Sequence, residues 1–145
     1  MNETTNETAQ TSIEAALQSI ANGGEATAFE VVYDDMHALY GGETLTLQSS
    51  GTLDAVWQSP PTDTRHTHTA NLSAEDVRAI ATLLISLHAW RQDVPEQTVP
   101  PDTTFSHVRI RVGSETSDVW ELHDRMERLN QVQTALRAHV PGLAR

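Results

Sequence analysis

The chain has 145 residues, enough for one hydrophobic core, and 20 acidic against 9 basic residues give it a net charge of −11. All nine basic residues are arginines and there is no cysteine, which excludes disulfides and thiolate metal sites. No apolar run approaches the ~20 residues of a membrane helix, and the surplus of carboxylates argues against nucleic-acid binding.

The acidic residues are unevenly distributed. Residues 1–64 carry ten of them and no basic residue. This pattern is most typical of a solvated acidic surface, and the alternative is an acidic face for a basic protein partner or a nucleic-acid mimic. The lysine-free, threonine-rich composition resembles that of proteins from halophiles, or it reflects a GC-rich genome. The N-terminus lacks the basic and apolar regions of a signal peptide, so a cytoplasmic location is expected.

The chain begins with a polar segment and a short amphipathic one. Residues 1–10 are predicted to be a disordered tail. The sequence T-S-I-E from Thr11 matches a capping box and Gly23-Gly24 supply a stop, which predicts a helix over residues 11–22. A helix this short would be only marginally stable in isolation. It is therefore expected either to dock on its own domain or to bind a partner.

From Ala28 the apolar period changes to two, which is typical of strands. The pair Gly41-Gly42 and the turn residues 49–51 separate three such segments, and residues 64–70 are predicted to return as an edge strand. The inward-facing residues predicted for the three segments are Phe29, Val31 and Tyr33, then Leu45 and Leu47, then Leu53, Ala55 and Trp57.

The longest apolar-periodic segment, residues 72–90, is predicted to be the main helix. Ser73 is placed at the N-cap, with Glu75 and Asp76 in the first turn. A helix this apolar has to pack against a sheet. Its predicted inner stripe consists of Val77, Ile80, Ala81, Leu84, Leu87 and His88, widened by Leu83 and Ile85.

A hairpin is predicted from residues 105–112 and 118–123. Pairing Ile110 with Trp120 puts an apolar set, including Val108 and Leu122, on the core side. On the other face, the same register sets Arg109 opposite Glu121 and His107 opposite His123.

Asp124, with Glu127 three residues later, is predicted to cap a last helix that Pro141-Gly142 end. Its predicted inner stripe is Met126, Leu129, Gln133, Leu136 and Val140. The order of elements predicts a single α+β domain over residues 11–145. We expect one antiparallel sheet of five to six strands, with two main helices packed on one face and a short N-terminal helix.

Seven histidines are many for a chain of this length. His66 and His68 would point to one side of a strand, and Glu121 would share a face with His107 and His123. Zinc takes three or four ligands, so neither histidine pair alone, His66 with His68 or His107 with His123, is complete. Joining the two pairs requires the edge strand to lie near the hairpin. The alternative is that these are exposed polar residues and that the chain has no cofactor.

No catalytic signature is present: no serine lies in a nucleophile elbow, and no glycine-rich loop suits a phosphate. A non-enzymatic protein is therefore expected. The candidate partner-binding residues are Gly41 and Gly42, the proline-rich loop 91–104, and Trp90 with Arg91. Trp90 ends the main helix beside that loop and is expected to be partly exposed, as an aromatic anchor would be.

The second half resembles a known family. The order of a Leu-Ser helix at residue 72, a loop, Asp102-x-x-Phe105 opening a strand, a second strand and a short helix is similar to that of emfourins over residues 72–140. Those are small α+β protein inhibitors of thermolysin-like metalloproteases. The first half departs, since the chain has Tyr40-Gly41-Gly42-Glu43 where that family tends to carry Gly-Gly-aromatic. The resemblance also extends to uncharacterised small bacterial domains, and no inhibitory residue is carried over.

The sequence thus predicts a module that binds a protein partner, with the inhibitor function as the one that the resemblance implies. The alternatives are a histidine-lined metal-binding domain and an acidic protein of immunity or mimic type that covers a basic surface.

Overall fold

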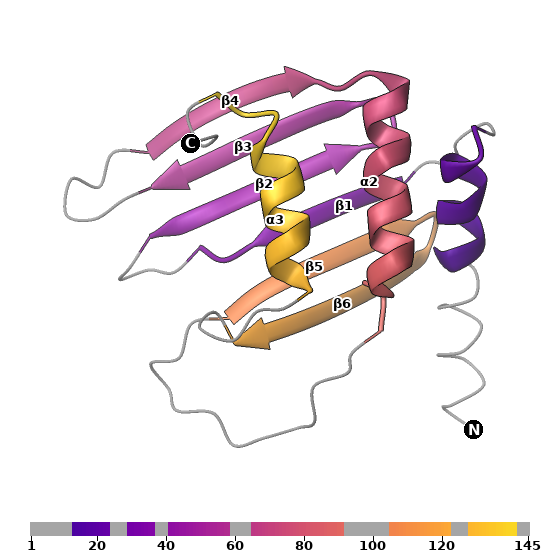
Figure 1. Cartoon of the computed structure of the whole chain (residues 1–145). Coiled ribbons are helices and arrows are strands. Elements are labelled where there is room, and N and C mark those ends of the chain that lie inside the picture. Colours follow the sequence, from indigo (N-terminus) through magenta and orange to yellow (C-terminus); the bar gives the residue numbers. More distant parts are fainter. Residues whose placement is uncertain are drawn as a thin grey trace.

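The computed structural model describes residues 13–23, 29–36, 41–58, 65–91, 105–122 and 128–141. Six strands form one fully antiparallel sheet in the order β4-β3-β2-β1-β5-β6, and the helices cover one of its faces (Figure 1). The predicted α+β class is confirmed. The elements are β1 (Phe29–Asp34), β2 (Gly42–Gln48), β3 (Thr52–Gln58), β4 (Arg65–Asn71), α2 (Ala74–Leu87), β5 (Phe105–Val112), β6 (Glu115–Leu122) and α3 (Leu129–Arg137), preceded by a helix over residues 13–21.

The sheet follows from alternation in the sequence. Each of β1, β2 and β3 alternates buried with half-exposed residues, because successive side chains of a strand point to opposite faces. The predicted inward residues of β1 to β3 are all in the core except Trp57, which packs against its rim. The predicted edge strand is also confirmed: β4 lies at one end of the strand order and is exposed at six of its seven residues.

The predicted capping of the main helix is confirmed. The Ser73 hydroxyl accepts a hydrogen bond from the Asp76 backbone N–H at 3.1 Å, and Glu75 and Asp76 lie in the first turn. The helix ends at His88, which adopts the left-handed conformation at φ 51°. His88 is therefore an exposed cap and not part of the inner stripe. The stripe itself buries Val77, Ile80, Ala81 and Leu84.

The N-terminal helix docks on its own domain. Ile13, Leu17 and Ile20 belong to the core, with at most 4% of their surface exposed, and Gly23 follows the helix with φ 82°. Because its apolar face is already covered, this helix has none left for a partner. The predicted tail of residues 1–10 lies outside the described residues.

The last helix begins later than predicted. α3 starts at Leu129, its N-cap position is Arg128, and no side chain of that residue caps it. The helix also ends earlier than predicted, at Arg137, but the predicted inner residues Leu129, Gln133, Leu136 and Val140 are all buried. The predicted Asp124 cap and Met126 lie outside the described residues.

The predicted register of the β5–β6 hairpin is wrong. Ile110 lies opposite Ser117, His107 opposite Trp120, and Arg109 opposite Asp118. The observed register differs from the predicted one by three positions, since Ile110 lies opposite residue 117 and not 120. Because three is an odd number, this shift turns every side chain of one strand to the other face of the sheet. Val119 and Glu121 therefore point to the core, whereas Trp120 points away from it.

Candidate functional site

All helices described lie on one side of the sheet, and none of them covers the other side, which we call the open face (Figure 1). In the register of the five strand pairs, this open face carries the carboxylates of Glu30, Asp34, Asp54 and Asp118, and the guanidinium groups of Arg65, Arg109 and Arg111. Four negative and three positive charges give a net −1, in a chain whose net charge is −11. The remaining open-face positions of the central strands are mainly threonine and valine.

Each open-face carboxylate has a partner. Asp34 accepts from the Thr44 hydroxyl at 2.9 Å, and Asp54 accepts from the Thr69 hydroxyl at 2.8 Å. Glu30 lies 3.9 Å from Arg111. Because these groups are already compensated, covering them would cost less than burying isolated charges.

The β5–β6 end of this face gathers the residue types of a binding hot spot. We define the hairpin patch as His107, Arg109, Asp118 and Trp120. Asp118 lies 3.3 Å from the His107 ring and 3.5 Å from Arg109. The side chains of His107 and Arg109 are 40% and 56% exposed, and Trp120 is half-buried. Tryptophan and arginine dominate hot spots in protein interfaces.

A second polar group is buried between the sheet and α3. The Tyr33 hydroxyl donates to Asp35 Oδ2 at 2.8 Å and lies 3.2 Å from Ser106 Oγ. Asp35 Oδ1 in turn accepts from the Glu43 backbone N–H at 2.7 Å. Tyr33 and Ser106 are fully buried and Asp35 nearly so. This chain of hydrogen bonds therefore fixes the end of β1 and the start of β2 to β5.

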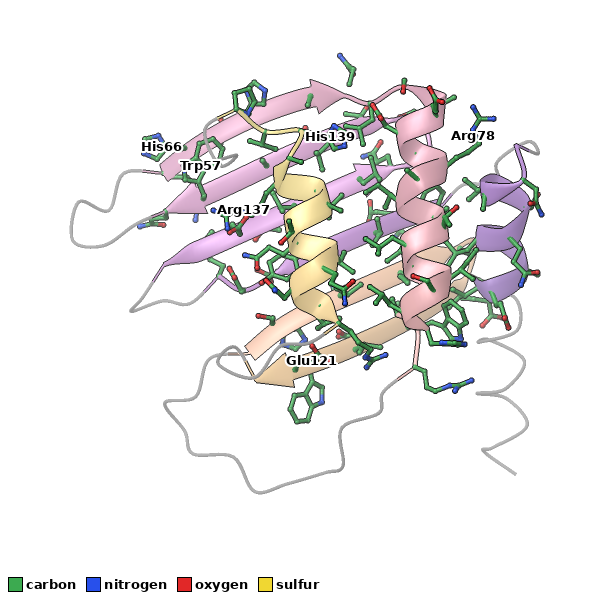
Figure 2. All side chains as sticks on the ribbon, viewed as in Figure 1. Trp57, His66, Arg78, Glu121, Arg137 and His139 are labelled. Atoms are coloured by element: carbon green, nitrogen blue, oxygen red, sulfur yellow. The ribbon has the colours of Figure 1, made fainter. Side chains whose placement is uncertain are left out.

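Carboxylates from two strands hold α3 in place. Glu43 of β2 accepts from the Gln133 side-chain amide at 2.9 Å and lies 3.4 Å from Arg137 Nε. Glu121 of β6 accepts from the Leu129 backbone N–H at 3.1 Å and pairs with Arg128 at 3.3 Å. Figure 2 labels Arg137 and Glu121 near opposite ends of the helix. These contacts assign Glu43 and Glu121 to the attachment of α3.

Burial raises the pKa of Tyr33 far above its usual value near 10, and the hydrogen bond to Ser106 only partly opposes this effect. The folded state therefore keeps the proton at pH values where the unfolded state loses it. Above pH ~10 we expect the free energy of unfolding to fall, by up to ~1.4 kcal/mol per pH unit for this group. Urea unfolding between pH 8 and 11 measures the slope. Tyr33→Phe should remove it, and an unchanged slope in that variant would contradict the assignment.

The described residues of the predicted zinc site do not come together. His107 and Glu121 lie on opposite faces of the sheet, and His66 and His68 lie on β4, at the edge farthest from β6. His123 lies outside the described residues. His107 pairs with Asp118 instead of Glu121, and His66 stacks on Trp57 with ring centroids 5.4 Å apart (Figure 2). Within the described ranges, no three histidine, aspartate or glutamate side chains could hold one metal ion.

The predicted partner-binding residues are also separated. Trp90 is 3% exposed and belongs to the core, so the expectation of a partly exposed anchor is wrong; Arg91 beside it is exposed. Gly41 and Gly42 lie at the start of β2, where both have positive φ and Gly42 contacts Asp35. Residues 92–104 of the predicted binding loop lie outside the described residues.

The sequence patterns do not predict the hairpin patch, because the predicted strands 105–112 and 118–123 leave residues 113–117 as the turn. Val112 pairs with Glu115, so the connection is the two residues Gly113-Ser114, with Gly113 at φ 57°. A Gly-Ser pair between alternating segments is a signal for a two-residue hairpin. A two-residue turn at Gly113-Ser114 gives the observed register, with Trp120 on the open face.

No protein-family model matches the chain, and no curated protein matches its sequence. None of the helices in the described part of the chain has the length and apolarity that crossing a bilayer requires.

Proposed function

We propose that this chain is a non-enzymatic module that binds a protein partner through the open face of its sheet. The observation that carries the proposal is the contrast in charge: net −1 on the open face, with each carboxylate partnered, against −11 for the chain. Like charges set against one another across an interface are costly, whereas opposite charges that nearly cancel within one face avoid this repulsion. A nearly neutral, threonine- and valine-rich surface is therefore the part of this acidic chain that is best suited to being covered.

Within that face the hairpin patch supplies the anchor. Trp120 is half-buried opposite His107. The exposed Arg109 lies two residues along β5 from His107, on the same face of the sheet. A thermolysin-like metalloprotease is the first partner to test, because the order of elements over residues 72–140 resembles that of emfourins.

The proposal is tested with Trp120→Ala, which removes the aromatic anchor from the open face. We expect the wild-type chain to inhibit a thermolysin-like protease stoichiometrically and the variant to bind at least ~10-fold more weakly, since truncating a hot spot costs about 2 kcal/mol or more. Asn130→Ala is the matched control, because Asn130 is exposed on α3, on the opposite side of the sheet. Equal inhibition by all three proteins would contradict the role of the patch.

If the protease is not inhibited, the binding-module proposal is tested separately. A photo-crosslinking amino acid at Thr116, beside Asp118 on the open face, should capture one protein from a lysate of the source cells. The same group at Asn130 should not. Identical capture from both positions, or none from either, would contradict binding through the open face.

A further inference from the structure

The two edges of the sheet differ in how they are protected against pairing. The edge strand β6 carries three carboxylates, Glu115, Asp118 and Glu121, and the first and last of these point to the helix side. Inward-pointing charges are a usual protection of sheet edges. β4, with the sequence RHTHTAN, carries no carboxylate and no proline, although the chain has 20 acidic residues.

β4 is also regular and accessible. Its seven residues pair with β3 without a bulge, from Thr52 opposite Asn71 to Gln58 opposite Arg65. In the described part of the chain no strand pairs with its outer side, and every residue except Ala70 is exposed. A strand of this kind presents its outer backbone groups as a template for another strand.

One hydrogen bond fixes which backbone groups point outward. Leu72 N–H donates to Gly51 O at 2.8 Å, which continues the β3–β4 ladder by one pair. Because backbone groups alternate along an antiparallel strand, the groups of Ala70, His68 and His66 also point to β3. The N–H and C=O groups of Arg65, Thr67, Thr69 and Asn71 therefore point away from the sheet.

We propose that β4 pairs with β4 of a second copy of this chain, antiparallel about a two-fold axis at His68. Two copies with a net charge of −11 each repel one another, so a self-interface requires a surface without carboxylates, and β4 is such a surface. Residues opposite one another in an antiparallel pair share a face, so a symmetric pairing must set one residue opposite itself.

Centring on His68 uses the whole strand. Arg65 then lies opposite Asn71 of the partner subunit, and Thr67 lies opposite Thr69 of the partner subunit. All four outward-pointing residues of each copy form hydrogen-bonded pairs, and threonine pairs across strands are favourable. Centring on Thr67 would leave Asn71 beyond the paired segment of β4. The proposed interface joins two six-stranded sheets edge to edge, with the helices of both copies on one side.

Charge exchange tests the pairing. Thr67→Glu/Thr69→Glu sets like charges opposite one another in both threonine pairs, and so does Thr67→Lys/Thr69→Lys. We expect the wild-type chain to sediment as a dimer, with twice the 15.9 kDa of one chain, and each variant to be a monomer. Mixing the two variants should restore the dimer. Circular dichroism checks that both variants fold, which is expected for substitutions at exposed edge positions.

Single cysteines test the register, because the chain has none of its own. In a pair without mutual hydrogen bonds, opposing Cα atoms lie about 4.5 Å apart, within the range for a disulfide. His68→Cys should therefore form a covalent dimer on mild oxidation. His66→Cys is the matched control, since it faces Ala70 of the partner subunit and lies about 13 Å from its own counterpart.

Several results would overturn the proposal. They are a monomer at every concentration of the wild-type chain, a dimer that both charge variants retain, and equal crosslinking of His68→Cys and His66→Cys. Crosslinking through Thr67→Cys in place of His68→Cys would also overturn it, because it would place the axis one residue away.

Discussion

Replacing Gly42 by alanine is expected to lower the free energy of unfolding by about 3–5 kcal/mol, because the backbone and its neighbours both exclude a side chain there. Gly42 has φ 140°, a conformation that L residues rarely adopt, and a Cβ atom would lie 2.5 Å from the Asp35 carbonyl oxygen and 2.6 Å from its carboxylate. Backbone would have to move. The shift would displace the Asp35 carboxylate, which accepts from the Glu43 N–H and the Tyr33 hydroxyl.

Gly113→Ala is the matched control for this prediction. Gly113 also has positive φ, 57°, but nothing lies within 4 Å of its Cβ position, so only the conformational cost of about 1–2 kcal/mol is expected. Chemical unfolding of the three proteins, followed by tryptophan fluorescence, gives the comparison. Equal losses in the two variants would mean that the contact with Asp35 contributes nothing.

The elements that could be predicted from the sequence are those with strong local signals. The Ser73 cap and the apolar stripe ending near Leu84 located α2, and alternation from Phe29 to Trp57 located three strands with the correct inward residues. Their faces follow from periodicity, which depends only on local geometry. The predicted edge position of β4 followed from its polar composition in the same way.

What failed depended on contacts between distant residues. The register of β5 and β6 depends on a two-residue turn, and a shift of three positions was enough to exchange Trp120 with Val119 between the faces. Trp90 was expected to be exposed because it lies next to a loop, yet it is in the core. A residue beyond the end of a helix has no periodicity to indicate its burial, so only tertiary packing decides it.

The sequence indicates only part of the buried polar group formed by Tyr33, Asp35 and Ser106. Tyr33 was predicted to point inward, and a buried tyrosine hydroxyl requires a hydrogen-bond partner. That partner comes from Asp35, two residues along, and from Ser106 of β5, 73 residues away. Only the sheet order, with β5 beside β1, brings Ser106 there, and local patterns do not encode sheet order.

Glu121→Ala is expected to lower the free energy of unfolding by about 2–4 kcal/mol, because the carboxylate holds the start of α3. It is 5% exposed, accepts from the Leu129 N–H, and pairs with Arg128, which in turn donates to the Leu87 and His88 carbonyls at the end of α2. Removing the carboxylate leaves the Leu129 N–H and the Arg128 guanidinium without this acceptor at the junction of α2, α3 and β6. Urea unfolding measures the loss in stability. The rate of amide hydrogen exchange should increase most, relative to the wild-type chain, at residues 129–133.

Glu121→Gln separates the hydrogen bond from the charge. Glutamine keeps an acceptor for the Leu129 N–H but loses the ion pair with Arg128, so a smaller loss is expected than for alanine. The same pair of variants decides between attachment of α3 and the metal-ligand role that sequence patterns suggested for Glu121. Attachment predicts that both losses appear in zinc-free buffer and are unchanged by added zinc. Stabilisation of the wild-type chain by zinc, abolished by Glu121→Ala, would instead mean that the carboxylate leaves α3 to bind a metal.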